Sequence, residues 1–120
     1  MNKKRSNAPI FWSLFGAGGA LAALVGPVLV LVTGIVTAVG IWIPQTALSY
    51  ERVLAFARHW GGKAFLLAVI SLFLWHAAHR IFHSLHDVGV HPGTGCKLLC
   101  YGGALLGTII AATELISIGF

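Results

Sequence analysis

The chain has 120 residues, of which 58% are hydrophobic and 9% are charged, and this composition excludes an ordinary soluble domain. Its net charge of +5 comes from eight Lys and Arg against three Asp and Glu; in so apolar a chain this excess indicates membrane orientation and contact with anionic lipid, not nucleic-acid binding. Residues 1–120 suffice for a single membrane domain, so soluble catalytic machinery must belong to other chains.

The first predicted element is a membrane span over residues 11–43, which follows a basic arm and contains no charged residue. At about 1.5 Å per residue it would measure roughly 50 Å, against a hydrocarbon core of about 30 Å. We therefore expect a kink at Pro27, a tilt, or irregular ends. The apolar stretch is also far longer than the core of a secretory signal, so we expect it to be retained.

A short interfacial helix, or a lead-in to the second span, is predicted over residues 47–60, because Glu51, Arg52 and Arg58 are distributed among apolar side chains there. Gly61-Gly62 should separate it from a second span over residues 63–87. A glycine-rich loop then leads to a third span over residues 98–118. In that span, Gly103, Gly107 and Ala111 recur every fourth residue and predict a close helix contact. The predicted fold is an all-α integral membrane protein with three transmembrane helices.

The end of the second span carries a polar stripe, which includes four of the six histidines. At about 100° per residue, one face of this helix would present His76, His79, Arg80, His83, His86 and Asp87. Any single histidine at a membrane interface is commonly just solvated or bonded to headgroups. Four histidines on one face, with an arginine, favour a functional site, because polar groups in a membrane are costly.

Charge distribution predicts the topology. With a cytoplasmic amino terminus, that side would hold five basic residues and the opposite side three. Three spans then place the carboxyl terminus in the periplasm and the polar stripe at the cytoplasmic end of the second span. Because Trp12 begins the first span on the same side, we expect Trp12, Arg80 and the histidines to share a pocket.

Quinone is the ligand that these residue types suit. Arg80 is a permanent donor for negative charge on a quinone oxygen, and the Trp12 indole donates without accepting. Histidines can take up the protons that quinol oxidation releases, and Asp87 is placed to fix the tautomer of His83. Alternatively, Trp12 is only an aromatic anchor at the membrane surface.

Other site classes are less well supported. A haem with two axial histidines would need a second protein chain, because no other span contains a histidine. A transporter would need more ionisable groups in the membrane than Glu114. Cys96 and Cys100, four residues apart on one helix, are poorly placed for a disulfide. We expect neither a metal site nor a catalytic residue in this chain.

Three separated motifs carry a family resemblance. They are Phe11-Trp-Ser-Leu-Phe-Gly-Ala-Gly-Gly19, Ala47-Leu-Ser-Tyr-Glu-Arg-Val-Leu-Ala-Phe56 and His79-Arg-x-x-His-x-x-His-Asp87. Together they resemble the D subunit of the four-subunit bacterial fumarate reductases, one of two small membrane anchors. Some relatives have a second adjacent histidine where this chain has Phe82, so no role is carried over to that residue.

The resemblance implies a function and a set of partners. Such a chain, with a second small membrane anchor (the C subunit), attaches an iron–sulfur subunit and a flavoprotein subunit to the cytoplasmic face of the inner membrane. Menaquinol is then oxidised and fumarate reduced in anaerobic respiration. The flavin and the iron–sulfur clusters belong to the partner subunits, and no haem is expected. Two alternatives are a purely structural anchor without quinone contacts and a haem-bearing anchor of the succinate dehydrogenase type.

The resemblance also implies the residues of the proximal menaquinone site. Trp12, Arg80 and His83 match the quinone-binding positions of the family. We expect His79, His86 and Asp87 to support that site or to handle protons.

Overall fold

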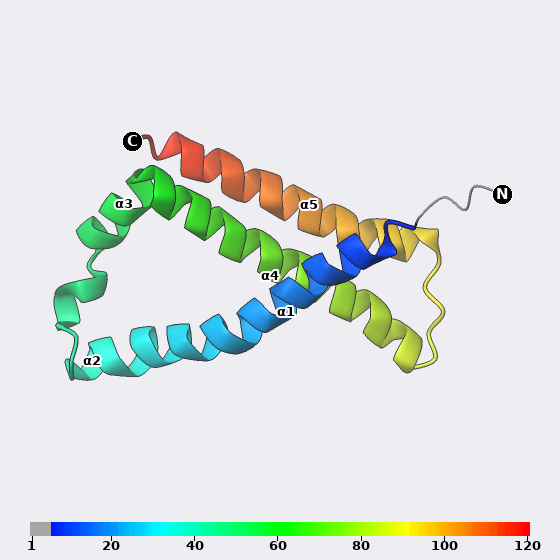
Figure 1. Cartoon of the computed structure of the whole chain (residues 1–120), viewed down its shortest axis with the longest axis horizontal. Helices are drawn as coiled ribbons and strands as arrows, with labels where there is room; N and C mark the ends of the chain where they lie inside the picture. The colour runs from blue at the N-terminus through cyan, green and yellow to red at the C-terminus, as the bar shows by residue number, and fades with distance from the viewer. Residues whose placement is uncertain (1–5) are drawn as a thin grey trace.

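The computed structural model describes residues 6–120 and is built of helices joined by short connections (Figure 1). Three helical stretches are long and apolar enough to cross a membrane: Ala8–Val39, Trp60–Asp87 and Thr94–Ser117. A short helix, α3 (Tyr50–Arg58), lies between the first and second of them. The predicted all-α fold with three candidate spans and one short intervening helix is therefore confirmed.

The first span is one continuous helical stretch with a local change of geometry. It comprises α1 (Ala8–Leu31), the π-helix η1 (Val32–Val36) and α2 (Thr37–Val39). Helix α1 continues through Pro27, and the departure from α geometry comes five residues later in η1. There the Thr37 hydroxyl donates to the carbonyls of Val32, at 2.8 Å, and Thr33, at 3.1 Å.

The first span ends earlier than the sequence predicted. Gly40, with φ of 74°, stops the helix in a left-handed conformation, so residues 41–43 lie outside it. A 3₁₀ helix, η2 (Gln45–Leu48), then leads to α3. The predicted helix over residues 47–60 is thus two separate elements, with Ser49 in an extended conformation between them.

The predicted separation at Gly61-Gly62 is wrong, because both glycines lie in the first turn of α4 (Trp60–Asp87). His59 caps this helix: its ring Nδ1 accepts from the Gly61 amide at 3.1 Å. A Cβ atom at Gly62 would lie 1.8 Å from the Phe56 carbonyl oxygen. Glycine is required here because the backbones of α3 and α4 meet at a sharp corner.

The end of α4 is closed by its own backbone. Gly89, with φ of 83°, donates to the His86 carbonyl, and Val90 donates to the Leu85 carbonyl. These two bonds form a Schellman motif, which satisfies carbonyls at the helix end. A short connection then leads to α5 (Thr94–Ser117), which begins four residues before the predicted third span.

Helix α4 is central, since it packs against both α1 and α5 (Figure 1). Small residues make these contacts: a Cβ at Gly18 would lie 2.7 Å from the Leu72 carbonyl, and one at Gly107 would lie 2.9 Å from Leu74 Cδ1. Gly103, predicted on the same contact face as Gly107, instead faces open space. Most large apolar side chains are exposed, as expected when the surrounding solvent is lipid.

Candidate functional site

The polar stripe lies in the carboxyl-terminal half of α4, at the molecular end where α1 and α5 begin (Figure 1). His79 is its centre. The His79 ring stacks on Phe15 of α1, with centroids 4.1 Å apart and planes inclined by 14°. Its Nδ1 atom lies 3.0 Å from the Tyr101 hydroxyl of α5. One histidine thus ties the three long helices together.

Two further predicted residues adjoin His79. The Trp12 ring approaches it edge-on at 6.1 Å, and the His83 ring lies 4.3 Å away, one helical turn further along α4. We call Trp12, Phe15, His79, His83 and Tyr101 the His79 cluster. Trp12 thus lies near two histidines of the stripe, and the expectation that Trp12, Arg80 and the histidines share a pocket stays a prediction.

His76 has a structural role that the sequence did not indicate. Its Nδ1 atom lies 3.2 Å from the Phe15 carbonyl, which can only accept, so this nitrogen carries the proton. A Cβ at Gly19 would lie 2.8 Å from the imidazole Cε1. The glycine therefore leaves room for the ring between α1 and α4.

The outer part of the stripe is open. Arg80, His83, His86 and Asp87 are all exposed, and Trp12 is 68% exposed. His86 Nδ1 lies 3.2 Å from the Phe82 carbonyl. Within residues 6–120, Arg80 makes no side-chain hydrogen bond or ion pair, and none joins His83 to Asp87. The pairing of His83 with Asp87 stays a prediction, and the Arg80 guanidinium is available to a ligand or a partner.

Sequence reasoning missed Phe15 and Tyr101, although a signal for Tyr101 existed. His79 lies eight residues before the end of α4, and Tyr101 lies seven residues after the start of α5. Antiparallel helices joined by a short loop bring such positions to one depth. No comparable signal marked Phe15, since its contact with His79 depends on the angle at which α1 crosses α4.

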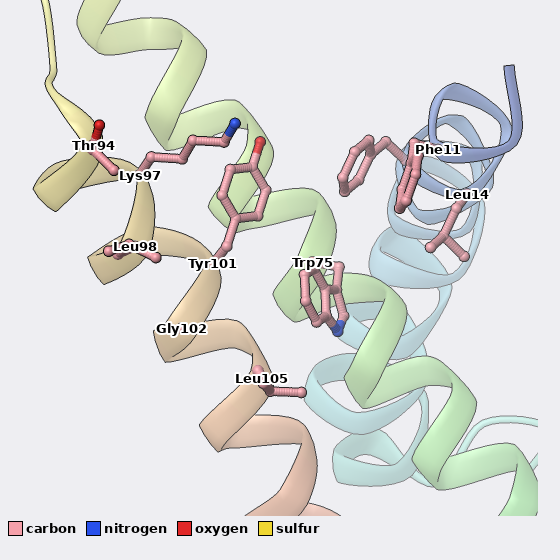
Figure 2. Close-up of a pocket in the computed structure, with 10 residues that line it drawn as sticks. Phe11, Leu14, Trp75, Thr94, Lys97, Leu98, Tyr101, Gly102 and Leu105 are labelled. Carbon is pink, nitrogen blue, oxygen red and sulfur yellow. The ribbon is translucent and has the colours of Figure 1, made fainter. Parts of the chain in front are cut away.

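An apolar groove lies beside the His79 cluster, with a volume of about 790 Å³ (Figure 2). It runs between the start of α1 and the first half of α5, and Trp75 of α4 also lines it. Phe15 and Tyr101 belong both to the groove and to the cluster, whereas Trp12, Arg80 and His83 do not line the groove. The two aromatic rings therefore form a shared wall between the groove and the polar stripe.

The part of the chain that the structure describes, residues 6–120, has no group of three or more His, Cys, Asp or Glu side chains that could hold a metal ion. Cys96 and Cys100 of α5 are both free thiols. The chemistry that this geometry offers is hydrogen bonding: an exposed guanidinium, an indole and imidazoles beside an aromatic wall. Such a site can bind and orient a flat polar ligand.

Comparison with known proteins identifies the family. The model of the family described as the D subunit of fumarate reductase matches residues 2–116, nearly the whole chain. The chain belongs to the fumarate reductase D-subunit family. It is 46% identical over 117 residues to the fumarate reductase D subunit of Vibrio cholerae, covering 98% of this chain and 87% of the relative. For the Vibrio vulnificus protein the identity is 47% over 108 residues, with coverages of 90% and 84%.

A relative from another genus shows the same likeness. The fumarate reductase D subunit of a Shewanella species is 43% identical over 116 residues, which is 96% of this chain and 94% of that protein. The resemblance seen in the sequence motifs is therefore confirmed. As a member of the D-subunit family, the chain is a membrane component of a fumarate reductase complex, and its function implies other subunits and a lipid bilayer.

Proposed function

We propose that this D subunit anchors a quinol:fumarate reductase to the bacterial inner membrane and contributes to its proximal menaquinone site. Its partners are a second small membrane anchor, the C subunit, and the iron–sulfur and flavoprotein subunits, which carry the clusters and the flavin. Electrons from menaquinol then pass to the iron–sulfur subunit in anaerobic respiration. The chain itself has no catalytic centre in this proposal.

One observation carries the quinone assignment: exposed hydrogen-bond donors gather around His79 at one end of the spans. Trp12 approaches His79 edge-on, His83 lies 4.3 Å from it, and Arg80 follows it in the chain with an exposed guanidinium. A quinone has two carbonyl oxygens that need donors and a flat ring that needs apolar walls. Trp12, Arg80 and His83 supply the donors, and Phe15 supplies an apolar wall.

The remaining members of the stripe have supporting roles. Tyr101 and Phe15 hold the His79 ring between them, so His79 positions its neighbours Trp12 and His83. His86 and Asp87 are exposed in the last turn of α4, where the helix leaves its apolar stretch. There they can exchange protons with water.

The orientation rests on the distribution of basic residues. The starts of α1 and α5 and the end of α4 lie at one end of the molecule (Figure 1). Arg80 and Lys97 belong to that end, and in the sequence Lys3, Lys4 and Arg5 come just before α1; this total of five of the eight basic residues favours the cytoplasm for that end. The menaquinone site then faces the cytoplasmic partner subunits.

The test is Arg80→Leu in the complex purified through a tag on this chain. Quinol-linked fumarate reduction should fall about tenfold or more, because a charge-assisted hydrogen bond of about 1.5–3 kcal/mol is lost. Fumarate reduction by a soluble viologen dye, which bypasses the quinone, should stay close to the unmodified value. Flavin and iron–sulfur absorbance should co-purify with the tagged chain in both proteins.

The matched control is Arg58→Leu, which removes another exposed arginine, from the last turn of α3 at the opposite end of the spans. Both activities should persist in this variant. Equal loss of quinol-linked and dye-linked activity in Arg80→Leu would instead indicate failed attachment of the soluble subunits, and the quinone assignment would be abandoned in favour of a purely structural anchor.

A further inference from the structure

The groove between α1 and α5 shares Phe15 with the quinone proposal, but none of the proposed quinone donors Trp12, Arg80 and His83 lines it. Its α5 wall is a single helix face, formed by Thr94, Lys97, Leu98, Tyr101, Gly102 and Leu105. Phe11 and Leu14 of α1 form the opposite wall. A volume of about 790 Å³ falls within the range of about 300–1,000 Å³ that is typical of small-molecule pockets.

The length of the groove matches one leaflet of a bilayer. From Thr94 to Leu105, at about 1.5 Å per residue, α5 descends roughly 16 Å. The hydrocarbon core of a bilayer is about 30 Å thick, so the groove reaches from the membrane surface to near its middle. An acyl chain of the adjacent leaflet extends over the same depth.

Polarity changes along the groove in the way that a phospholipid requires. Thr94, Lys97 and the Tyr101 hydroxyl lie at the end nearest the start of α5, and Leu105 lies at the other end (Figure 2). The Lys97 amine is exposed and forms no ion pair with any other residue of the described range 6–120. A fixed cation above an apolar slot is complementary to an anionic headgroup above an acyl chain.

We propose that this groove binds one anionic phospholipid, with its phosphate at Lys97 and one acyl chain between α1 and α5. A quinone tail would leave Lys97 without a counter-charge, and the proposed quinone donors do not line the groove. The lipid proposal therefore uses different polar groups from the quinone assignment, although both include a contact with Phe15. Because Phe15 and Tyr101 form the shared wall, the bound lipid packs against the rings that hold His79.

The test is native mass spectrometry of the delipidated complex, titrated with phosphatidylglycerol or with phosphatidylcholine of the same acyl chains. Phosphatidylglycerol should bind about tenfold more tightly, as expected for one charge-assisted contact. Lys97→Gln should remove this preference. Arg58→Gln, which removes an exposed cation of α3 remote from the groove, should keep it.

Substitutions at two adjacent glycines test whether the groove holds an acyl chain. Gly102 lines the groove and Gly103 does not, yet a Cβ at either position would meet no atom within 4 Å. Gly102→Leu adds a side chain on the groove side, where its Cβ meets no neighbour, and should weaken the binding of both lipids about tenfold. Gly103→Leu makes the same change in helix propensity and should bind lipid as the unmodified complex does.

Three results would overturn the proposal. The first is equal binding of the two lipids by the unmodified complex, and the second is equal binding by the Gly102→Leu and Gly103→Leu complexes. The third is a Gly102→Leu complex that keeps its phosphatidylglycerol but loses menaquinone or a partner subunit. That result would assign the groove to an isoprenoid chain or to a protein helix.

Discussion

Lys63 is one of two buried polar residues in the described part of the chain, with 8% of its surface exposed. Its amine donates to the Leu115 carbonyl of α5 and lies 5.1 Å above the Phe120 ring. Leu115 is in the last turn of α5, where carbonyls lack partners within the helix and the helix dipole is negative. The Lys63 amine therefore supplies a hydrogen-bond donor and a positive charge to the carboxyl-terminal end of α5. This role explains why a charged side chain is buried in a membrane protein.

Lys63→Met should loosen the last turn of α5. The methionine fills the same space but cannot donate to the Leu115 carbonyl, a bond of about 1.5–3 kcal/mol. Hydrogen exchange of residues 114–119 in the purified complex should accelerate about tenfold or more. Arg52→Met, an exposed cation of α3, should leave this exchange unchanged. Unaltered exchange in Lys63→Met would show that the bond does not hold α5.

The residue types and their spacing in α4 were sufficient to predict the polar stripe, but they did not predict which side chains of α1 and α5 contact it. A helical period places His79, Arg80 and His83 on one face whatever the neighbouring helices do. The stacking of Phe15 on His79 depends on how α1 crosses α4, and no pattern within one helix encodes a crossing angle. For the same reason the role of His76 against the Phe15 carbonyl was not foreseen.

At the scale of elements, the crossing of α1 and α4 depends on close backbone approach. Gly18 is buried there, and a Cβ atom would lie 2.7 Å from the Leu72 carbonyl and 3.0 Å from His76 Cβ. Neither neighbour is the mobile end of a side chain, so the helices themselves must move apart. Close approach of this kind is the main source of helix association in lipid, where the hydrophobic effect between helices is absent.

Gly18→Ala should therefore destabilise the packing of α1 on α4 by about 1–3 kcal/mol, the usual cost of overpacking. We expect a lower thermal midpoint for the purified complex and weaker quinol-linked activity, since the same crossing carries Trp12 and Phe15 to His79. Gly16→Ala makes the identical change two residues away, where a Cβ meets nothing within 4 Å, and should be neutral or slightly stabilising. Equal midpoints for the two variants would contradict this account.

At the scale of the whole molecule, the described residues 6–120 contain three candidate spans, and if all three cross the membrane, the start of α1 and the end of α5 lie on opposite faces. The start of α1 and the loop between α4 and α5 would then share one face, and we expect this face to be the cytoplasmic one because most basic residues of the sequence lie in or next to these segments. With this arrangement, the polar stripe and the end of the groove near Lys97 face the same side of the membrane.

Reporter fusions test the topology. Alkaline phosphatase, which is active only after export, should be active when fused after Phe120 and inactive when fused in the loop after His91. A cytoplasmic fluorescent protein should give the reverse pattern. The same result at both positions would contradict three spans, and a full reversal would contradict the cytoplasmic amino terminus.

The sequence by itself determined the number of candidate spans, the short helix between the first two, and the family, because apolar length and separated motifs are properties of the chain alone. It placed the span boundaries less well: the first helix stops at Gly40, and α4 begins at Trp60, because local caps fix those ends. Only the tertiary structure decided that Phe15 and Tyr101 enclose His79, that Lys63 reaches Leu115, and that a groove opens beside Trp75. These features arise where helices distant in sequence meet, and small differences in crossing angle and rotation decide which side chains touch.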